Sequence, residues 1–387
     1  MPCRSRLKNG PGDGIGEAEI LRKGLALLVG WTIPRFEKFL EITKGDLHHW
    51  WSLADPGIEK MDFLTGHQRK QLGEIYEEGP ERLLESVDSW SGQIIVYDED
   101  RYPAGFREMG RPPVAVHILG SVEALSHQGI AVVGSRKIGV GAAKSARRIL
   151  QPALAAGMAV ISGGALGADA VGHRSAVDLN GVTIAVLPSG LHQPSPRSNR
   201  QLFRDIIEGR GALVSEYPPM QGVRNYHFRR RNGLIAALSR GVFVIRAAQK
   251  SGTMLTVEAA RELGRPLAAM PGLPDDPISR GCHDLVRDGA ELIASDGNLL
   301  QWWERLNDKA VVDGRPGAPE QQQILRPTCE VLDSAAQVLD EEGTFSLEAV
   351  ARRTGKSAAH LQSVLLTHEL SGIIEHVAGG ERYRMII

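Results

Sequence analysis

Short apolar runs rich in β-branched residues recur through the middle of this chain, and stretches of helical character separate them. Strands that are apolar throughout, without polar alternation, are typical of a parallel sheet covered by helices on both faces. We therefore expect an α/β domain with a Rossmann-like parallel sheet as its core, and ligands bind such sheets at the carboxyl ends of the strands. The expected strands are 129–133, 158–161, 182–187, 212–214, 242–245 and 266–270.

The pattern divides the 387 residues into four parts. Residues 1–95 have apolar positions at helical spacing, which predicts a small, SAM-like N-terminal helical domain. Residues 96–305 form the expected Rossmann-like domain. Residues 306–322 are polar with Gly and Pro, as in a linker, and residues 323–387 predict a C-terminal winged-helix domain.

The winged-helix prediction rests on three expected helices, 331–339, one that begins near the N-cap residue Ser346, and 357–370. Gly355 separates the second helix from the third, as a helix-turn-helix requires. A hairpin is expected from 372–377 and 383–387. The third helix has few basic residues, so a protein contact is at least as well supported as a nucleic-acid contact.

Composition favours a protein of the reducing cytoplasm. No apolar run approaches the roughly 20 residues of a membrane span, and the basic start lacks the apolar core of a secretory signal. Cys3, Cys282 and Cys329 lie far apart in sequence and form no CxxC pair. We therefore expect no metal site, no disulfide framework and no cofactor.

Charge is distributed unevenly although the net charge is only −1. The segment from Arg197 to Lys250 holds eleven Lys and Arg residues but only three acidic residues. A basic block in a neutral chain indicates a localised site for a polyanion, although a solvated basic face would give the same pattern.

The first strand is followed by a glycine-rich turn into a helix, with Gly134, Ser135, Arg136 and Lys137. Such a turn binds phosphate through backbone amides and an arginine, and by itself it would also suit NAD. The second strand argues against NAD, because it ends in Ser162 rather than in the acidic residue that binds the ribose. Its loop offers a second anion cradle with Gly163, Gly164 and Ala165.

Asp169 and His173 share one face of the helix that follows this loop. An Asp/His pair could be catalytic, but no interpretable nucleophile stands beside it. We favour a buried hydrogen-bonded pair that closes the helix onto the sheet.

A loop that runs to Asn232 combines aromatic and basic residues, from Tyr226 and Phe228 to Arg229, Arg230 and Arg231. It is expected to lie directly before an apolar helix, 234–238. Arginines bind phosphates and aromatic rings stack on bases, at about 1–3 kcal/mol per base. The alternative is that Phe228 belongs to the core and the arginines are a solvated cap.

Two further loops add candidate anion contacts, with Gly190 and Asn199 after the third strand and Ser251-Gly252-Thr253 after the fifth. Several such loops along one sheet edge exceed the need of one small cofactor. They suit the successive phosphates of a single nucleic-acid strand.

The ordered set of motifs resembles the DNA-processing protein A (DprA/Smf) family: Gly134-Ser135-Arg136, Ser162-Gly163-Gly164-Ala165 with Asp169 and His173, Ser215-Glu216-Tyr217-Pro218, Phe228 to Asn232, Ser251-Gly252-Thr253 and Pro271-Gly272. The resemblance implies a dimeric, non-enzymatic protein that binds single-stranded DNA and passes it to the RecA recombinase in natural transformation. The loops and the resemblance together select these candidate DNA contacts: Gly134, Ser135, Arg136, Lys137, Ser162, Gly163, Gly164, Ala165, Gly190, Asn199, Phe228, Arg229, Arg230, Arg231, Asn232, Ser251, Gly252 and Thr253.

The chain departs from the family pattern at four positions. Arg229 stands where the family usually has proline, Gly233 where it has arginine, His283 where it has asparagine and Gly172 where it has alanine. These changes bear on loop shape, fine specificity and the role in transformation.

Two other classes remain as alternatives. A Rossmann-like nucleoside-monophosphate hydrolase would need a Pro-Gly-Gly loop and a nearby glutamate, and Glu258 has the wrong spacing from Ser251-Gly252-Thr253. A sensor of a small nucleotide would not need the long basic loop from Arg224 to Arg231.

Overall fold

The structure is a computed structural model that divides into two compact units, residues 1–312 and 313–387. The residues that it describes are 17–28, 30–43, 50–51, 53, 56–79, 87, 90–312, 344–358, 361, 365, 374–377 and 382–385.

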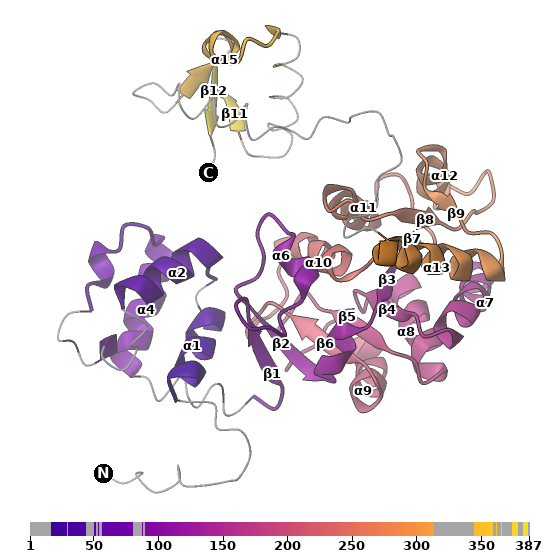
Figure 1. Ribbon diagram of the computed structural model, residues 1–387, viewed down its shortest axis with the longest axis horizontal. Coiled ribbons are helices and arrows are strands. Elements are labelled where there is room, and N and C mark those ends of the chain that lie inside the picture. The colour runs from indigo at the N-terminus through magenta and orange to yellow at the C-terminus, as the bar shows by residue number, and fades with distance from the viewer. Residues whose placement is uncertain are drawn as a thin grey trace, which may run out of the picture. The chain divides into compact units, whose positions relative to one another are not determined.

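A nine-stranded sheet forms the centre of the first unit (Figure 1). Its strand order is β1-β2-β6-β5-β4-β3-β7-β8-β9. The six strands expected from the sequence run parallel as β3 (Gly129–Val133), β4 (Ala159–Ser162), β5 (Thr183–Val186), β6 (Ala212–Ser215), β7 (Val242–Val244) and β8 (Leu267–Ala269). The predicted Rossmann-like core is confirmed.

Three strands at the edges of the sheet were not expected from the sequence: β1 (Gln93–Val96), β2 (Ala115–Gly120) and β9 (Glu291–Leu292). β2 pairs antiparallel with both β1 and β6, and β9 pairs parallel with β8. β9 has two exposed residues and therefore no apolar signal. β1 is short and begins at Gln93, inside the segment assigned to the helical domain.

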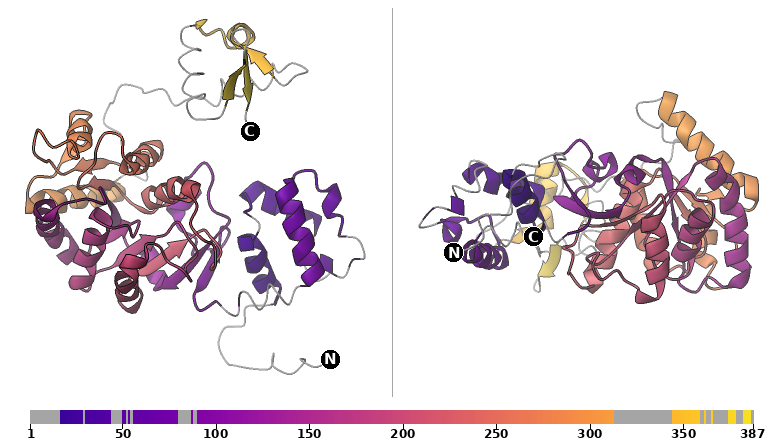
Figure 2. Two further views of the ribbon diagram at one scale, coloured as in Figure 1. Left: turned by 180° about the vertical axis from the view of Figure 1, so that it is seen from behind. Right: turned by 90° about the horizontal axis from the view of Figure 1, so that it is seen from below.

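Helices cover both faces of the sheet (Figures 1 and 2). On β3, Ile130 and Val132 pack toward one face and Ala131 and Val133 toward the other, so the strand is apolar at every position. The first face carries α7 (Val140–Ala155), α8 (Ala168–Asp178), α9 (Arg200–Glu208) and α13 (Asp296–Val312). The second carries α6 (Ala104–Arg107), α10 (Asn225–Leu238), α11 (Gly252–Glu262) and α12 (Arg280–Arg287).

The order of the strands reverses next to β3. The chain proceeds from β3 through β4 and β5 to β6, and β7 then returns to the other side of β3. In open α/β sheets the loops on the two sides of such a reversal leave toward opposite faces, and ligands bind at the carboxyl ends of the strands there. The glycine-rich loops after β3 and β4 leave the sheet at this edge.

The N-terminal part of the first unit is helical, as expected, with α1 (Glu17–Leu28), α2 (Ile33–Ile42), the 3₁₀ turn η1 (Ile58–Lys60) and α4 (Gly66–Glu78). Thr65 and Gln68 form a capping box at the start of α4. Phe36, Phe39 and Trp50 are buried in a core that continues to Leu213 of β6. The helices therefore share one hydrophobic core with the edge of the sheet.

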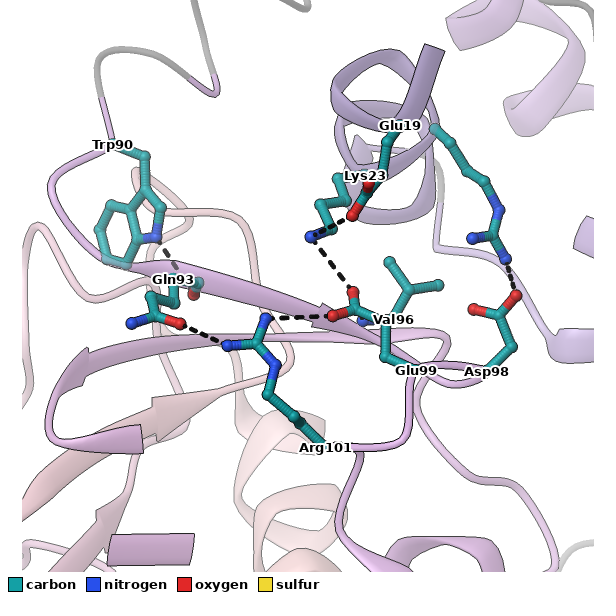
Figure 3. A network of polar contacts seen from close by, with 9 residues as sticks. Glu19, Lys23, Trp90, Gln93, Val96, Asp98, Glu99 and Arg101 are labelled. Carbon is teal, nitrogen blue, oxygen red and sulfur yellow. Dashed lines mark hydrogen bonds and ion pairs between the residues drawn. The ribbon is translucent and has the colours of Figure 1, made fainter. Parts of the chain in front are cut away.

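A polar network joins α1 to the end of β1 (Figure 3). Lys23 is almost fully buried and bridges Glu19 at 2.9 Å and Glu99 at 3.3 Å. Glu99 also accepts a hydrogen bond from the backbone N–H of Val96 at 2.9 Å and contacts Arg101 at 3.2 Å. Glu99 thus satisfies a backbone donor at the end of β1 and holds α1 against this edge of the sheet.

The second unit contains a three-stranded sheet in the order β10-β12-β11, formed by β10 (Thr344–Ser346), β11 (Ile374–Val377) and β12 (Arg382–Met385). β11 and β12 form the expected antiparallel hairpin. The hydroxyl of Ser346 accepts from the N–H of Ala349 at 3.2 Å and caps α15 (Leu347–Thr354), as expected, and Gly355 ends α15 with a φ of 67°. The helix expected at 331–339 and most of that at 357–370 lie outside the described residues.

Residues 306–312, assigned by the sequence to a linker, continue α13. The rest of that segment lies outside the described residues. Among the residues that the structure describes, no helix is long and apolar enough to cross a membrane.

Candidate nucleic-acid interface

A cavity of about 120 Å³ lies where β3, β4 and β5 end and α10 begins. Its lining combines two arginines, one aromatic ring and small or apolar residues, and it includes no carboxylate. The lining residues are Arg136, Gly163, Ala165, Leu166, Pro188, Ser195, Pro196, Phe228 and Arg231.

The loop after β3 presents Arg136 to this cavity. The N–H of Ser135 donates to the carbonyl of Arg246 at 2.6 Å, and the N–H of Lys137 donates to the Ser135 hydroxyl at 3.1 Å. A methyl group on Gly134 would meet the carbonyl oxygen of Arg246 at 3.0 Å, so glycine allows the loop to lie against β7. The loop is thus held by its backbone, while Arg136 and Lys137 are exposed.

The loop after β4 is fixed by internal hydrogen bonds. A carboxylate oxygen of Asp169 accepts from the N–H of Gly163 at 3.1 Å and of Ala165 at 3.2 Å. The side-chain amide of Asn199 donates to the carbonyl of Gly164 at 2.8 Å. The backbone amides of Gly163 and Ala165 were expected to bind an anion. In the structure they instead donate to Asp169 and hold the loop.

Arg231 is a buried arginine that joins two strand ends. Its guanidinium donates to the carbonyl of Gly163 and, at 3.0 Å, to that of Val186. Burial lowers the pKa of Arg231 to about 10, and the charge of Asp169 opposes that shift. Burial raises the pKa of the Asp169 carboxyl, and Arg231 and the two amides oppose that rise. Arg231 therefore supports the wall of the cavity rather than standing free in it.

Two guanidinium groups lie near the ring of Phe228. The Cζ atom of Arg136 is 5.6 Å from the centroid of its ring, and that of Arg231 is 5.9 Å away. Cations at this distance over a ring are attracted to its π-electrons. Phe228 is only half-buried, so the ring is held in place and still borders the cavity.

The segment from Tyr226 to Asn232 is helical, which corrects the expectation of a loop before the helix. α10 already begins at Asn225, and His227 Nδ1 lies 3.3 Å from the backbone nitrogen of Arg224 at its N-cap. Because each residue of an α-helix turns by about 100°, the neighbouring arginines point in different directions. Arg230 pairs with Glu216 at 2.8 Å and does not line the cavity, whereas Arg229 is exposed.

Several other candidate residues support the site without lining it. Ser162 is fully buried and donates to the carbonyl of Val132 at 2.6 Å. Asn232 donates to the carbonyl of Gly252 at 3.2 Å and so links α10 to the Ser251-Gly252-Thr253 turn. A methyl group on Gly190 would lie 2.0 Å from the carbonyl oxygen of Pro218, so only glycine fits there.

Asp169 and His173 both close α8 onto the sheet, but through different partners. His173 Nδ1 lies 2.7 Å from the Thr183 hydroxyl, which donates to the carbonyl of Val160. Since that hydroxyl proton is committed, Nδ1 is the donor and His173 carries its proton there. Both residues are buried, as expected, but no hydrogen bond joins them within the described part of the chain, so the expected hydrogen-bonded pair is wrong.

Four lining residues were not among the sequence candidates: Leu166, Pro188, Ser195 and Pro196. They lie in the loops after β4 and β5, beside residues that were selected. Their apolar or small side chains carry no chemical signal in a sequence, and only their position after a parallel strand could have indicated them.

A doubly wound sheet with an arginine-lined aromatic cavity at the carboxyl ends of β3, β4 and β5 defines a Rossmann-like binding protein of the α/β class. The family described as DNA recombination-mediator protein A matches residues 93–304, and the DprA winged helix domain matches residues 330–380. The chain belongs to this DNA-processing (DprA/Smf) family.

Known relatives agree with this assignment. Protein Smf of Escherichia coli K12 is 35% identical over 312 residues, which cover 78% of this chain and 81% of that protein. DNA processing protein DprA of Streptococcus pneumoniae R6 is 37% identical over 206 residues, covering 53% of this chain and 72% of that protein.

Solved structures of the family show the same fold. DNA processing protein A from Streptococcus pneumoniae has a TM-score of 0.61 and 29% identity, covering 74% of this chain and 98% of that one. The Helicobacter pylori protein, whose structure concerns its single-stranded DNA binding mode, has a TM-score of 0.50 and 24% identity, covering 56% of this chain and 97% of that one.

Proposed function

We propose that this protein binds single-stranded DNA through the cavity at the end of β3, β4 and β5, protects the incoming strand and loads a RecA-type recombinase onto it. The role would be in natural transformation or recombination, in the cytoplasm, as a homodimer and without catalysis. The observation that carries the proposal is Phe228, which borders the cavity with the guanidinium groups of Arg136 and Arg231 near its ring. Stacking rings combined with cations are what a single strand requires.

The cavity favours a strand over a small nucleotide. Pockets that enclose a drug-sized ligand measure about 300–1,000 Å³, whereas this one measures about 120 Å³. A cavity of this volume has room for one base or one phosphate, and the rest of the strand would lie outside the cavity. A nucleoside-monophosphate hydrolase would also need an acidic group at the substrate, and none of the lining residues is acidic.

We propose different roles for the candidate residues. Arg136, exposed beside Phe228, would bind phosphate, and Lys137 and Arg229 would add attraction from the rim. Gly163, Gly164, Ala165, Asn199, Arg231 and Asn232 would shape the site. The domain spanning 96–305 would carry the DNA contacts, and the winged helix at 323–387 would contact protein.

Arg136→Ala and Phe228→Ala are each expected to weaken binding of a labelled oligothymidine by about tenfold or more, because each removes a phosphate contact or a stacking contact. Fluorescence anisotropy at two salt concentrations measures this, with the matching duplex as a competitor. Arg136→Ala is also expected to reduce the slope of log K against log salt by about 0.7, the contribution of one phosphate of a single strand.

Arg148→Ala is the matched control for charge, since Arg148 is exposed on α7 and pairs with Asp296 at 2.7 Å. Equal losses for Arg136→Ala and Arg148→Ala would show that only overall charge matters. Absence of strand binding by the wild type at low salt would overturn the proposal and favour a nucleotide sensor.

Recombinase loading has its own expected result. On a strand coated with single-strand-binding protein, the wild type should accelerate the formation of RecA filaments, measured by strand-dependent ATP hydrolysis. Phe228→Ala should lose this acceleration in proportion to its loss of DNA affinity. If the wild type binds strands and leaves the rate unchanged, the loading role is wrong and the binding role stands.

A further inference from the structure

Tyr226 is an exposed aromatic residue that the cavity does not explain. Its side chain is 62% exposed at the start of α10 and does not line the cavity. Large aromatic side chains usually bury much of their surface, whereas the ring of Tyr226 is accessible to a ligand.

The ring of Tyr226 is held by a stack of rings. It meets His227 edge to face, with centroids 4.5 Å apart, and His227 stacks on Tyr217 with centroids 3.8 Å apart. His227 is almost fully buried, and its Nδ1 lies 3.0 Å from the carbonyl oxygen of Pro188, a lining residue of the cavity. Tyr226 is therefore fixed relative to the cavity, and most of its side chain remains exposed.

Tyr226 and Phe228 lie on opposite sides of one helix. Each residue of an α-helix turns by 100°, so two positions separate their side chains by about 200°. Arg229, three positions after Tyr226, shares its face, is exposed and has no ion pair within the described part of the chain. The side of α10 that faces away from the cavity thus carries a ring and a cation of its own.

We propose that Tyr226 is a second stacking site, which takes a base of the same strand next to the one held at Phe228. The strand would cross the N-terminus of α10 between the two rings. There the helix dipole and the exposed Arg224 favour a phosphate, and Arg229 would take the next one. This inference rests on the proposed single-strand binding and adds the direction in which the strand leaves the cavity.

The test uses the full chain and an oligothymidine of about 16 nucleotides, the upper range of a single-strand site. Tyr226→Ala should weaken binding by about tenfold, the loss of one stacked base, with an unchanged salt slope. Tyr226→Phe should bind like the wild type. Met220→Ala is the matched control, since Met220 is 66% exposed in the loop before α10 and should have no effect.

An abasic strand of the same length separates stacking from a structural role. Wild type and Tyr226→Ala should bind it equally, because it offers no base to stack. Weaker binding of the abasic strand by Tyr226→Ala would overturn the inference, as would wild-type affinity of Tyr226→Ala for oligothymidine. If Phe228→Ala is impaired in that experiment, the proposed function survives. If the wild type binds no strand, the proposed function itself fails.

Discussion

Arg231→Ala is expected to lower the free energy of unfolding by about 3–5 kcal/mol, the loss typical of removing one partner from a buried charged network. The substitution leaves the carbonyls of Gly163 and Val186 without a donor, and Asp169 without the nearby positive charge. Chemical denaturation followed by circular dichroism measures this loss. The loops after β4 and β5 should become accessible to protease at the same time.

Two variants control for the charge and the position. Arg229→Ala, two residues away, should cost less than about 0.5 kcal/mol, because Arg229 is exposed. Arg231→Lys should not restore stability, since an ammonium group cannot donate to two carbonyls in the planar geometry of a guanidinium. Equal stabilities of Arg229→Ala and Arg231→Ala would contradict the supporting role assigned to Arg231.

Acidification is expected to destabilise the protein well before its surface carboxylates titrate. Burial lowers the pKa of His117 and of His173 to about 3 from the ordinary 6.5. Between these values the unfolded chain binds a proton at each histidine and the folded chain does not. Stability is therefore fully present above pH 6.5 and falls as the pH drops toward 3, by about 1.4 kcal/mol per pH unit for each histidine.

The unfolding free energy measured at intervals from pH 7 to pH 4 checks this prediction. His117→Leu should reduce the slope by about one proton, because it removes one titrating group from a fully buried position beside Trp90. A slope that stays flat down to pH 5 would mean that these histidines titrate normally in the folded protein.

Much of the fold was predictable because its signals are local. Six parallel strands followed from apolar runs, since a strand buried on both faces must be apolar along its whole length. The helical character of the N-terminal part and the cap formed by Ser346 also depend on residues close in sequence. The edge strand β9 was missed because it has only two residues, both exposed, and β1 was missed because it begins at Gln93, inside the segment assigned to the helical domain.

The candidate site was predictable as a set of loops but not as a set of contacts. The sequence selected Arg229, Arg230 and Arg231 together, and the helix places one in solvent, one against Glu216 and one in the core. The sequence predicted that the backbone amides of Gly163 and Ala165 bind an anion, but both donate to the carboxylate of Asp169.

The sequence by itself determined the class of fold, the family and the edge of the sheet where binding is proposed. Local periodicity and glycine spacing carry that information, and both can be interpreted without knowing which distant residues come into contact. The tertiary structure alone decided which cation faces the cavity, because the partners of Arg231 are 68 and 45 residues away. A buried guanidinium must satisfy its donors wherever the fold brings carbonyls to it, and no local pattern records that choice.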